Sequence, residues 1–145
     1  MRAGCSTPKT APGSLAQGKE RVAQLVLDAA HALPATSQYT PPTKVGTQTC
    51  RKTIVGYAFG TTGAHRVELP LLVSTAEGQS ATALLARIEA AWRGTGYRLD
   101  RSRLHDGRFP QLRAHAPGGY DVVATALPAA SQIDLYAVSP CLRGS

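Results

Sequence analysis

The densest group of side chains that could carry acid-base chemistry lies between residues 100 and 115. It comprises Asp100, His105, Asp106 and His115, and an aspartate that orients a histidine is half of a hydrolytic triad. The sequence lacks the Gly-x-Ser-x-Gly motif that would present a nucleophilic serine. His105-Asp106-Gly107 also suits a tight turn, in which Asp and Gly meet the backbone requirements. We therefore favour a turn here, with a small secreted hydrolase centred on His105 and Asp106 as an alternative.

The other groups that could hold a metal or a phosphate lack the required spacing. His31 and His65 are far apart in the chain, and no two histidines show the His-x-x-x-His spacing of a helical metal site. The glycines at 94 and 96 and at 118 and 119 suit turns or caps, because a phosphate loop follows a strand and opens a helix. The sequence therefore predicts no catalytic residue, no metal and no cofactor.

One cluster of basic residues could bind a partner without catalysing a reaction. Its arginines stand near Tyr97, Phe109 and Tyr120, and guanidinium groups beside aromatic rings suit carboxylates, phosphates or sugars. A solvated sheet face is the competing interpretation. The candidate binding surface comprises Arg98, Arg101, Arg103, Arg108, Arg113 and Tyr120.

The first cysteine lies in a motif typical of lipid attachment. Ala3-Gly4-Cys5, followed by a serine, matches the right-hand half of a bacterial lipobox, although Arg2 stands where an aliphatic residue is expected. Pro, Gly, Ser and Thr dominate the following residues, as in a flexible spacer. We expect residues 1–18 to be a lipidated spacer and 19–145 to be one domain. A cytosolic protein with an accidental match is the alternative.

The other two cysteines bracket the expected folded region. Cys50 and Cys141 each stand beside a strand-like run, and a disulfide between them would close a loop of about 90 residues, worth about 4–5 kcal/mol. A zinc site would need further ligands that the four histidines do not supply at motif spacing. We predict the disulfide over metal binding or free thiols, and with it an oxidising location outside the cytoplasm.

Composition narrows the class of protein. The chain has 145 residues, 43% of them hydrophobic, which is enough for a single core. No apolar run approaches the roughly 20 residues of a membrane-spanning helix. The net charge of +7 could favour nucleic acid, but the basic residues are scattered and lack the interleaved aromatics of a base-stacking platform. We expect no nucleic-acid partner, and an anionic cell surface or membrane is the better counterpart.

Hydrophobic periodicity predicts the elements that would position these residues. Apolar residues recur at helical spacing from Ser14 to Leu33 and again from Ser80 to a stop at Gly94 or Gly96, with Trp92 on the core side. The strand-like runs are Thr49–Gly60, His65–Ser74, Tyr97–Leu104, Gln111–Ala116, Tyr120–Leu127 and Gln132–Val138, with a first hairpin turn at Gly60–Gly63. We expect an α+β domain, ordered α-β-β-α-β-β-β-β, in which two helices cover one face of an antiparallel sheet of about six strands.

The whole pattern resembles the small secreted lipoproteins of actinobacteria, of the LppA-like kind, most of which have no assigned function. The shared features are the cysteine-led polar start, a cysteine before the first hairpin, the run from Ala91 to Tyr97, the strand meander, and the closing Ser139-Pro140-Cys141-Leu142. The resemblance implies a fold and a membrane-anchored or secreted address, with Trp92 and Tyr97 in the core, but no chemistry.

These observations favour a monomeric, non-enzymatic lipoprotein of the cell envelope. We expect it to be anchored through Cys5 and to bind an envelope protein or an anionic polymer through an exposed sheet face. An immunity or inhibitor protein that docks on a secreted enzyme is a further alternative to the hydrolase.

Overall fold

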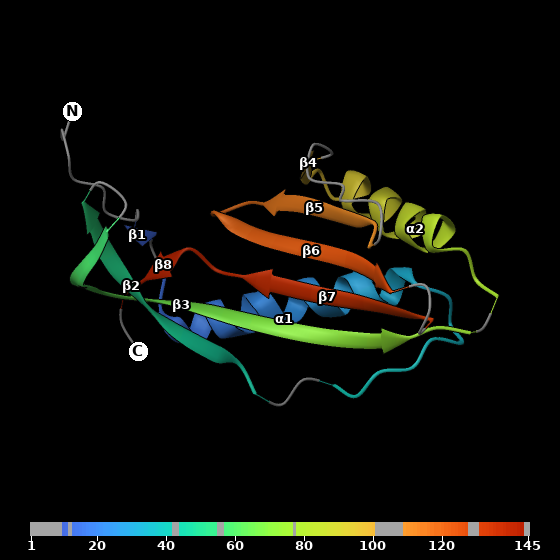
Figure 1. Cartoon of the computed structure of the whole chain (residues 1–145), viewed down its shortest axis with the longest axis horizontal. Coiled ribbons are helices and arrows are strands. Elements are labelled where there is room, and N and C mark those ends of the chain that lie inside the picture. The colour runs from blue at the N-terminus through green and yellow to red at the C-terminus, as the bar shows by residue number, and fades with distance from the viewer. Residues whose placement is uncertain are drawn as a thin grey trace.

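The structure is a computed structural model that describes residues 10–11, 13–41, 44–54, 57–76, 78–100, 109–127 and 131–143. Within these residues, two helices and eight strands follow in the order β1-α1-β2-β3-α2-β4-β5-β6-β7-β8. Figure 1 shows an elongated, twisted sheet with α1 running along it behind β3 and β7. The predicted α+β class is confirmed. Two strands of two residues each, β1 (Thr10–Ala11) and β8 (Cys141–Leu142), add to the expected six.

Both helices begin where the sequence predicts, because a serine caps each of them. Before α1 (Leu15–Ala32), the Ser14 hydroxyl accepts from the backbone N–H of Gln17, and the Gln17 side chain accepts from the backbone N–H of Ser14. Before α2 (Ala81–Gly94), the Ser80 hydroxyl accepts a backbone N–H from the first turn. The expected boundary between spacer and domain, at residue 18, lies inside α1.

The described strands form one sheet in the order β1-β8-β3-β7-β6-β5-β4, and β2 pairs with β3. All neighbouring pairs are antiparallel except β1 with β8. The last three long strands have the predicted bounds, whereas the predicted strand Tyr97–Leu104 is described only as far as Asp100. The remaining bounds are β2 (Gly46–Ile54), β3 (Tyr57–Ser74), β4 (Arg98–Asp100), β5 (Gln111–Ala116), β6 (Tyr120–Leu127) and β7 (Gln132–Val138).

The turn of the first hairpin is not where the sequence predicts it. Gly60–Gly63 was expected to reverse the chain, but β2 ends at Ile54, β3 begins at Tyr57, and residues 60–63 continue β3. The register shifts on both sides of Arg51, so that extra residues of β3 are accommodated as bulges. The turn prediction is wrong because glycines inside a strand can mark a bulge as well as a turn.

The core lies on one side of the sheet. Alternate residues of β3, β5, β6 and β7 are buried, and they form one cluster with the buried residues of both helices. In α2 this cluster includes Ile88 and Trp92, which are 0% and 2% exposed, as the helical periodicity predicts. The alternate residues on the other side of β5, β6 and β7 are half-buried. The helices therefore leave the second side of these strands without a covering layer among the described residues.

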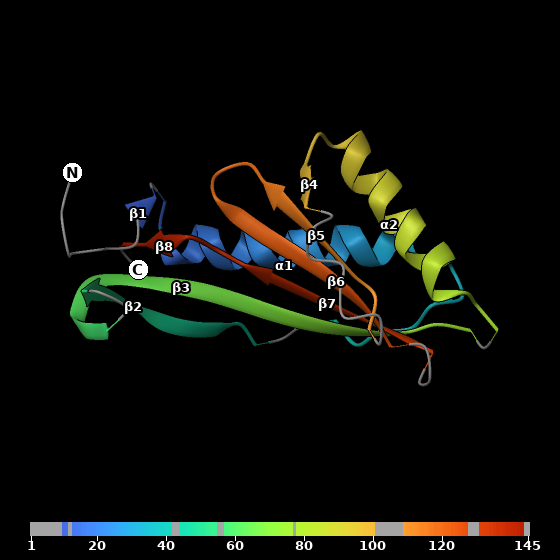
Figure 2. The ribbon, with the colours of Figure 1, turned by 45° about the horizontal axis from the view of Figure 1, so that its top comes forward.

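The disulfide joins the start of the sheet to its last strand. Cys50 in β2 and Cys141 in β8 have Cα atoms 6.2 Å apart and sulfur atoms 2.10 Å apart, and 91 positions separate them in the chain. Both side chains are buried. Figures 1 and 2 place β1, β8 and the β2–β3 hairpin together at one end of the molecule. The predicted bridge is thus confirmed, and it fastens this end of the sheet.

Candidate functional site

The uncovered side of the sheet is the first candidate site, and we call it the open face. It is formed by the outward-pointing residues of five neighbouring strands, whose register brings them into rows across the sheet. These residues are Arg66, Glu68, Pro70, Leu72 and Ser74 of β3, Gln132, Asp134, Tyr136 and Val138 of β7, Asp121, Val123, Thr125 and Leu127 of β6, Gln111, Arg113 and His115 of β5, and Arg98 and Asp100 of β4.

A histidine and an aspartate form a close pair near one end of the open face. His115 Nδ1 lies 2.6 Å from Asp121 Oδ1, and both side chains are roughly one-third exposed. Arg98 stands opposite His115 on β4, in the same row. No described serine, threonine or cysteine is hydrogen-bonded to His115, so the pair has the orienting half of a triad without a nucleophile at hand. The expected outward direction of His115 is confirmed.

The carboxylate that contacts His115 is Asp121, which was not in the patch of Asp100, His105, Asp106 and His115 expected from the sequence. Residues 105 and 106 lie outside the described residues, so that patch as a whole stays a prediction. A signal for this pair was available in the turn Pro117-Gly118-Gly119, where both glycines have positive φ. His115 and Asp121 are equidistant from Gly118, so counting outward along the hairpin makes them partners.

The candidate binding surface is only partly assembled by the described residues. Arg98 and Arg113 both lie on the open face, in neighbouring rows. Tyr120 does not join them, because it pairs with buried Ala116 and packs against the core. Arg101, Arg103 and Arg108 lie outside the described residues, as do Cys5 and the proposed hydrolytic residues His105 and Asp106.

Tyr136 stands near the middle of the open face and was missed by sequence reasoning. Val123 of β6 and Pro70 of β3 flank it in its row. Its hydroxyl donates a short hydrogen bond to the Glu68 carboxylate. Burial, and then the hydrogen bond to the Glu68 carboxylate and its negative charge, raise the pKa of Tyr136 to about 12. The phenol is therefore neutral and held in one orientation, with apolar side chains on both sides.

Charges of both signs surround this apolar centre. Burial raises the pKa of Asp134, which lies in the row next to Tyr136. The described residues of the open face carry three arginines, Arg66, Arg98 and Arg113, against four carboxylates, Glu68, Asp100, Asp121 and Asp134. Charges of both signs are therefore nearly balanced in this part of the face, which holds two of the five arginines of the expected basic surface.

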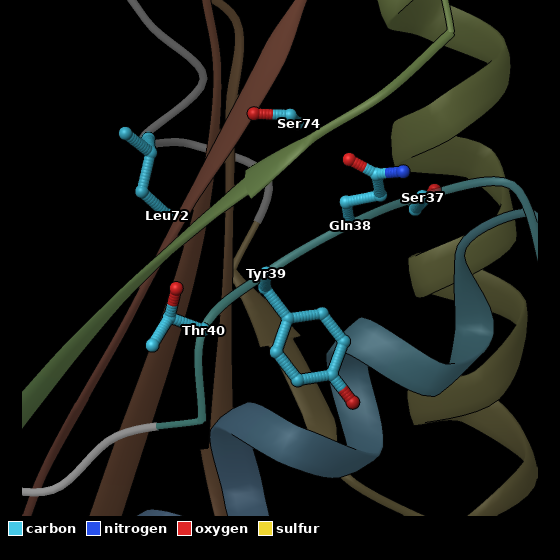
Figure 3. A pocket seen from close by; sticks show the side chains of 6 residues that line it. All are labelled: Ser37, Gln38, Tyr39, Thr40, Leu72 and Ser74. Atoms are coloured by element: carbon cyan, nitrogen blue, oxygen red, sulfur yellow. The ribbon is translucent and has the colours of Figure 1, made fainter.

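A second candidate site is a pocket at the edge of β3 (Figure 3). It has a volume of about 610 Å³ and is open to solvent. Figure 3 shows that β3 supplies two of its labelled side chains and the segment after α1 supplies the other four. The lining residues are Ser37, Gln38, Tyr39, Thr40, Leu72 and Ser74.

The part of the chain that the structure describes has neither a metal-binding cluster nor a membrane-spanning helix. It contains no group of three or more His, Cys, Asp or Glu side chains that could hold a metal ion. Neither of its helices is both long enough and apolar enough to cross a membrane. The open face and the β3 pocket are the two candidate sites that we consider further. The chain has no significant match among protein-family models, curated proteins or solved structures.

Proposed function

We propose that this protein is a lipoprotein of the cell envelope that binds a protein partner through the open face of its sheet. The observation that carries the proposal is the composition of that face, which has an aromatic and apolar centre inside a rim of charges. Protein interfaces commonly have this arrangement, with aromatic residues enriched at the centre and polar residues at the edge.

The centre of the open face suits a protein partner in three respects. Tyr136 presents a large ring between Val123 and Pro70, and tyrosine is among the residues that contribute most to interface affinity. Its hydrogen bond to Glu68 fixes the ring before binding, which lowers the entropy lost on association. The strands beneath are rigid, because the next residue along each one is buried in the core. A partner would therefore meet a preformed surface.

The charge balance distinguishes a protein partner from an anionic polymer. A polymer of phosphates or carboxylates is best held by a surface of one sign, whereas the described open face has four carboxylates for three arginines. Charges of both signs can pair with opposite charges on a protein partner, which orients the partner and disfavours proteins with a different charge pattern. The anionic polymer is thus the less favoured partner.

The extracytoplasmic address is supported by the buried disulfide. Disulfides persist in oxidising compartments and are rare in the reducing cytosol. The bridge between Cys50 and Cys141 closes most of the chain, so reduction would remove a large share of the domain's stability. Lipidation of Cys5 is supported by its sequence motif alone.

The experiment measures retention of the purified chain by isolated cell envelope. Tyr136→Ala should weaken retention by at least about tenfold, because truncation at the centre of an interface commonly costs 2 kcal/mol or more. Lys19→Glu, at an exposed position of α1, is the matched control and should bind normally. Treating the envelope with protease should abolish retention.

Other outcomes of the same experiment would reject the proposal. Unchanged retention by Tyr136→Ala would remove the open face as the site. Retention that survives protease and is lost instead in Arg98→Glu with Arg113→Glu would identify an anionic polymer. Identification of a crosslinked partner separates an envelope protein from a secreted enzyme that this chain would inhibit.

The pair of His115 and Asp121 supports a hydrolase as the second candidate, because a carboxylate 2.6 Å from a histidine can orient it as a base. Screening the pure protein against ester, amide and glycoside substrates tests this possibility. Turnover that is lost in His115→Ala and in Asp121→Asn would favour the hydrolase over the binding protein.

A further inference from the structure

The β3 pocket exists because strand pairing is interrupted along this edge of the sheet. Gln38 and Ser74 exchange two backbone hydrogen bonds, of 2.9 and 2.8 Å, and pairing resumes where Gly46 lies opposite Glu68. Seven residues, 39–45, lie between these pairs on the outer segment, against five, 69–73, on β3. The two stretches differ in length, so the pairing register does not continue from one pair to the other, and the pocket lies beside β3 next to the Gln38–Ser74 bridge.

The main chain of Leu72 faces this gap. Because Ser74 directs both its N–H and its C=O at Gln38, Leu72, two positions earlier in a regular stretch of β3, directs its own groups to the same edge. The described residues supply no hydrogen-bond partner for them. Pro70 also faces this edge, where its missing N–H costs no ladder bond. Leu72 thus offers one donor and one acceptor side by side.

The side chains around the gap carry no formal charge. Ser37, Thr40 and Ser74 supply hydroxyl groups, and Gln38 supplies an amide. Tyr39 and Leu72 add apolar surface, and the Leu72 side chain is 48% exposed. Hydroxyl and amide groups can donate and accept hydrogen bonds in any orientation that a ligand requires.

A second, independent observation also concerns this lining. The Ser37 Oγ is buried and has no hydrogen-bond partner among the described residues. Buried hydroxyl groups are nearly always satisfied in native proteins, and an unsatisfied one costs about 1–3 kcal/mol. Ser37 is also one of the residues that line the pocket, so a ligand with hydroxyl groups would lie next to this unpartnered hydroxyl.

We propose that the β3 pocket binds an uncharged sugar that carries an acetamido group. The free N–H and C=O of Leu72 recognise a secondary amide as a neighbouring strand would, and the neutral hydroxyl and amide groups match the hydroxyl groups of the sugar. The Gln38–Ser74 bridge and the start of β2 close the gap at its two ends. Between these ends Leu72 offers both a donor and an acceptor to the edge and Pro70 has no N–H, which suits one amide unit better than an added strand. Leu72 and Ser74 belong both to this pocket and to the edge of the open face, whereas Tyr136 at the centre of that face does not line the pocket.

The first test is an NMR titration of the ¹⁵N-labelled full chain. The probe is the trimer of N-acetylglucosamine, and the matched control is maltotriose, a glucose trimer without acetamido groups. The Leu72 amide signal should move on addition of the acetylated trimer and stay in place with the control. Equal shifts with both sugars, or no shift of Leu72, would overturn the proposal. Binding of acetyl-dialanine amide in place of the sugar would identify a peptide site.

The second test removes the backbone donor without truncating the sheet. Leu72→Pro deletes the N–H and should weaken binding of the acetylated trimer by about fivefold to tenfold, the value of one hydrogen bond. Leu72→Ala keeps the N–H and should change affinity by less than about threefold. Equal losses in the two variants would reject the backbone contact. If Leu72→Pro does not fold, the movement of the Leu72 amide signal in the titration of the unmodified chain is the deciding test of the proposal.

The two proposed sites fail independently. Arg113→Glu and Tyr136→Ala change the open face, so they should leave binding of the acetylated trimer unaltered. Conversely, Gln38→Ala removes an amide that lines the pocket and lies outside the open face, so it should weaken sugar binding and leave retention by protease-sensitive envelope components intact. Loss of sugar binding in Tyr136→Ala would place the sugar on the open face and overturn the pocket assignment.

Discussion

Gly18 shows how one missing side chain lets α1 approach the sheet. It lies within the helix and is buried. A Cβ at this position would stand 2.5 Å from Leu142 Cδ1 and 3.1 Å from Val67 Cγ2. Leu142 is itself only 1% exposed, so it has little room to move aside. The helix therefore tolerates a weak helix former here, because any larger residue would separate α1 from β8 and β3.

We predict that Gly18→Ala destabilises the protein by about 1–3 kcal/mol, the usual penalty for overpacking a core. Helix propensity alone predicts the opposite sign, a gain of about 1 kcal/mol. Gly94→Ala is the matched control, because nothing lies within 4 Å of a Cβ there and its φ is not positive. It should keep or slightly raise stability in urea unfolding. A stabilised Gly18→Ala would contradict the close packing.

Tyr136 gives a second prediction at this scale. Its phenol should ionise near the pKa of about 12, in NMR or ultraviolet titration, because burial and Glu68 both disfavour the phenolate. Glu68→Gln should lower this pKa but leave it above the ordinary value of 10, since burial remains. Glu89→Gln, on α2, should not change it. A pKa near 10 in the unmodified protein would contradict the contact.

The raised pKa of Tyr136 also determines how the folding stability of the protein changes with pH. The unfolded phenol loses its proton near pH 10 and the folded one near pH 12. Between these values the folded state binds more protons, so its stability falls as pH rises. Below pH 10 both states keep the proton, and the contribution of Tyr136 is fully present. Tyr136→Phe should show a shallower decline over this window.

Residue types alone predicted the helix caps but not the side-chain pairs of the open face. Serines 14 and 80 marked the helix starts because capping is local and acts within four residues. The pairing of His115 with Asp121 depends on hairpin register, which becomes readable only after the turn is counted. The link between Tyr136 and Glu68 joins two strands that are far apart in sequence. No local sequence pattern indicates such a pair.

Among the elements, the disulfide should dominate stability. It closes a loop across 91 positions, and the chain-entropy model assigns such a loop about 4–5 kcal/mol. Replacing both Cys50 and Cys141 by Ala should lower the urea midpoint accordingly, and reductant should do the same to the unmodified chain. Cys5→Ala is the control and should unfold normally. A midpoint insensitive to reductant would contradict the bridge as a source of stability.

The first hairpin shows where prediction of elements fails. The run Gly60-Thr-Thr-Gly63 has the composition of a turn, yet β3 continues through it, and its extra residues relative to β2 are accommodated by register shifts. Local signals favoured the turn, and pairing along the whole hairpin overrode them. β1 and β8 were missed for a related reason, since strands of two residues leave no periodicity to detect.

For the whole molecule, the fold class followed from the sequence, but the arrangement of the surface did not. Helical and two-residue periodicities report which side of an element is buried, and these gave the core correctly. They do not report which strands become neighbours, so the arginine cluster could not be placed. The structure separates Tyr120 from Arg98 and Arg113 by turning it to the core side. The carboxylates of neighbouring strands then balance the arginines.

The parallel pairing of β1 with β8 sets how far this domain could stand from a bilayer. Five peptide units connect Cys5 to Thr10, and an extended chain covers at most about 3.6 Å per residue. A lipid on Cys5 would therefore hold the end of the sheet where β1 pairs with β8 within about 18 Å of the lipid headgroups. The β3 pocket follows the far end of α1, whose 18 residues span about 27 Å. An anchored molecule would thus keep the disulfide end of the sheet near the bilayer and place the pocket farther from it.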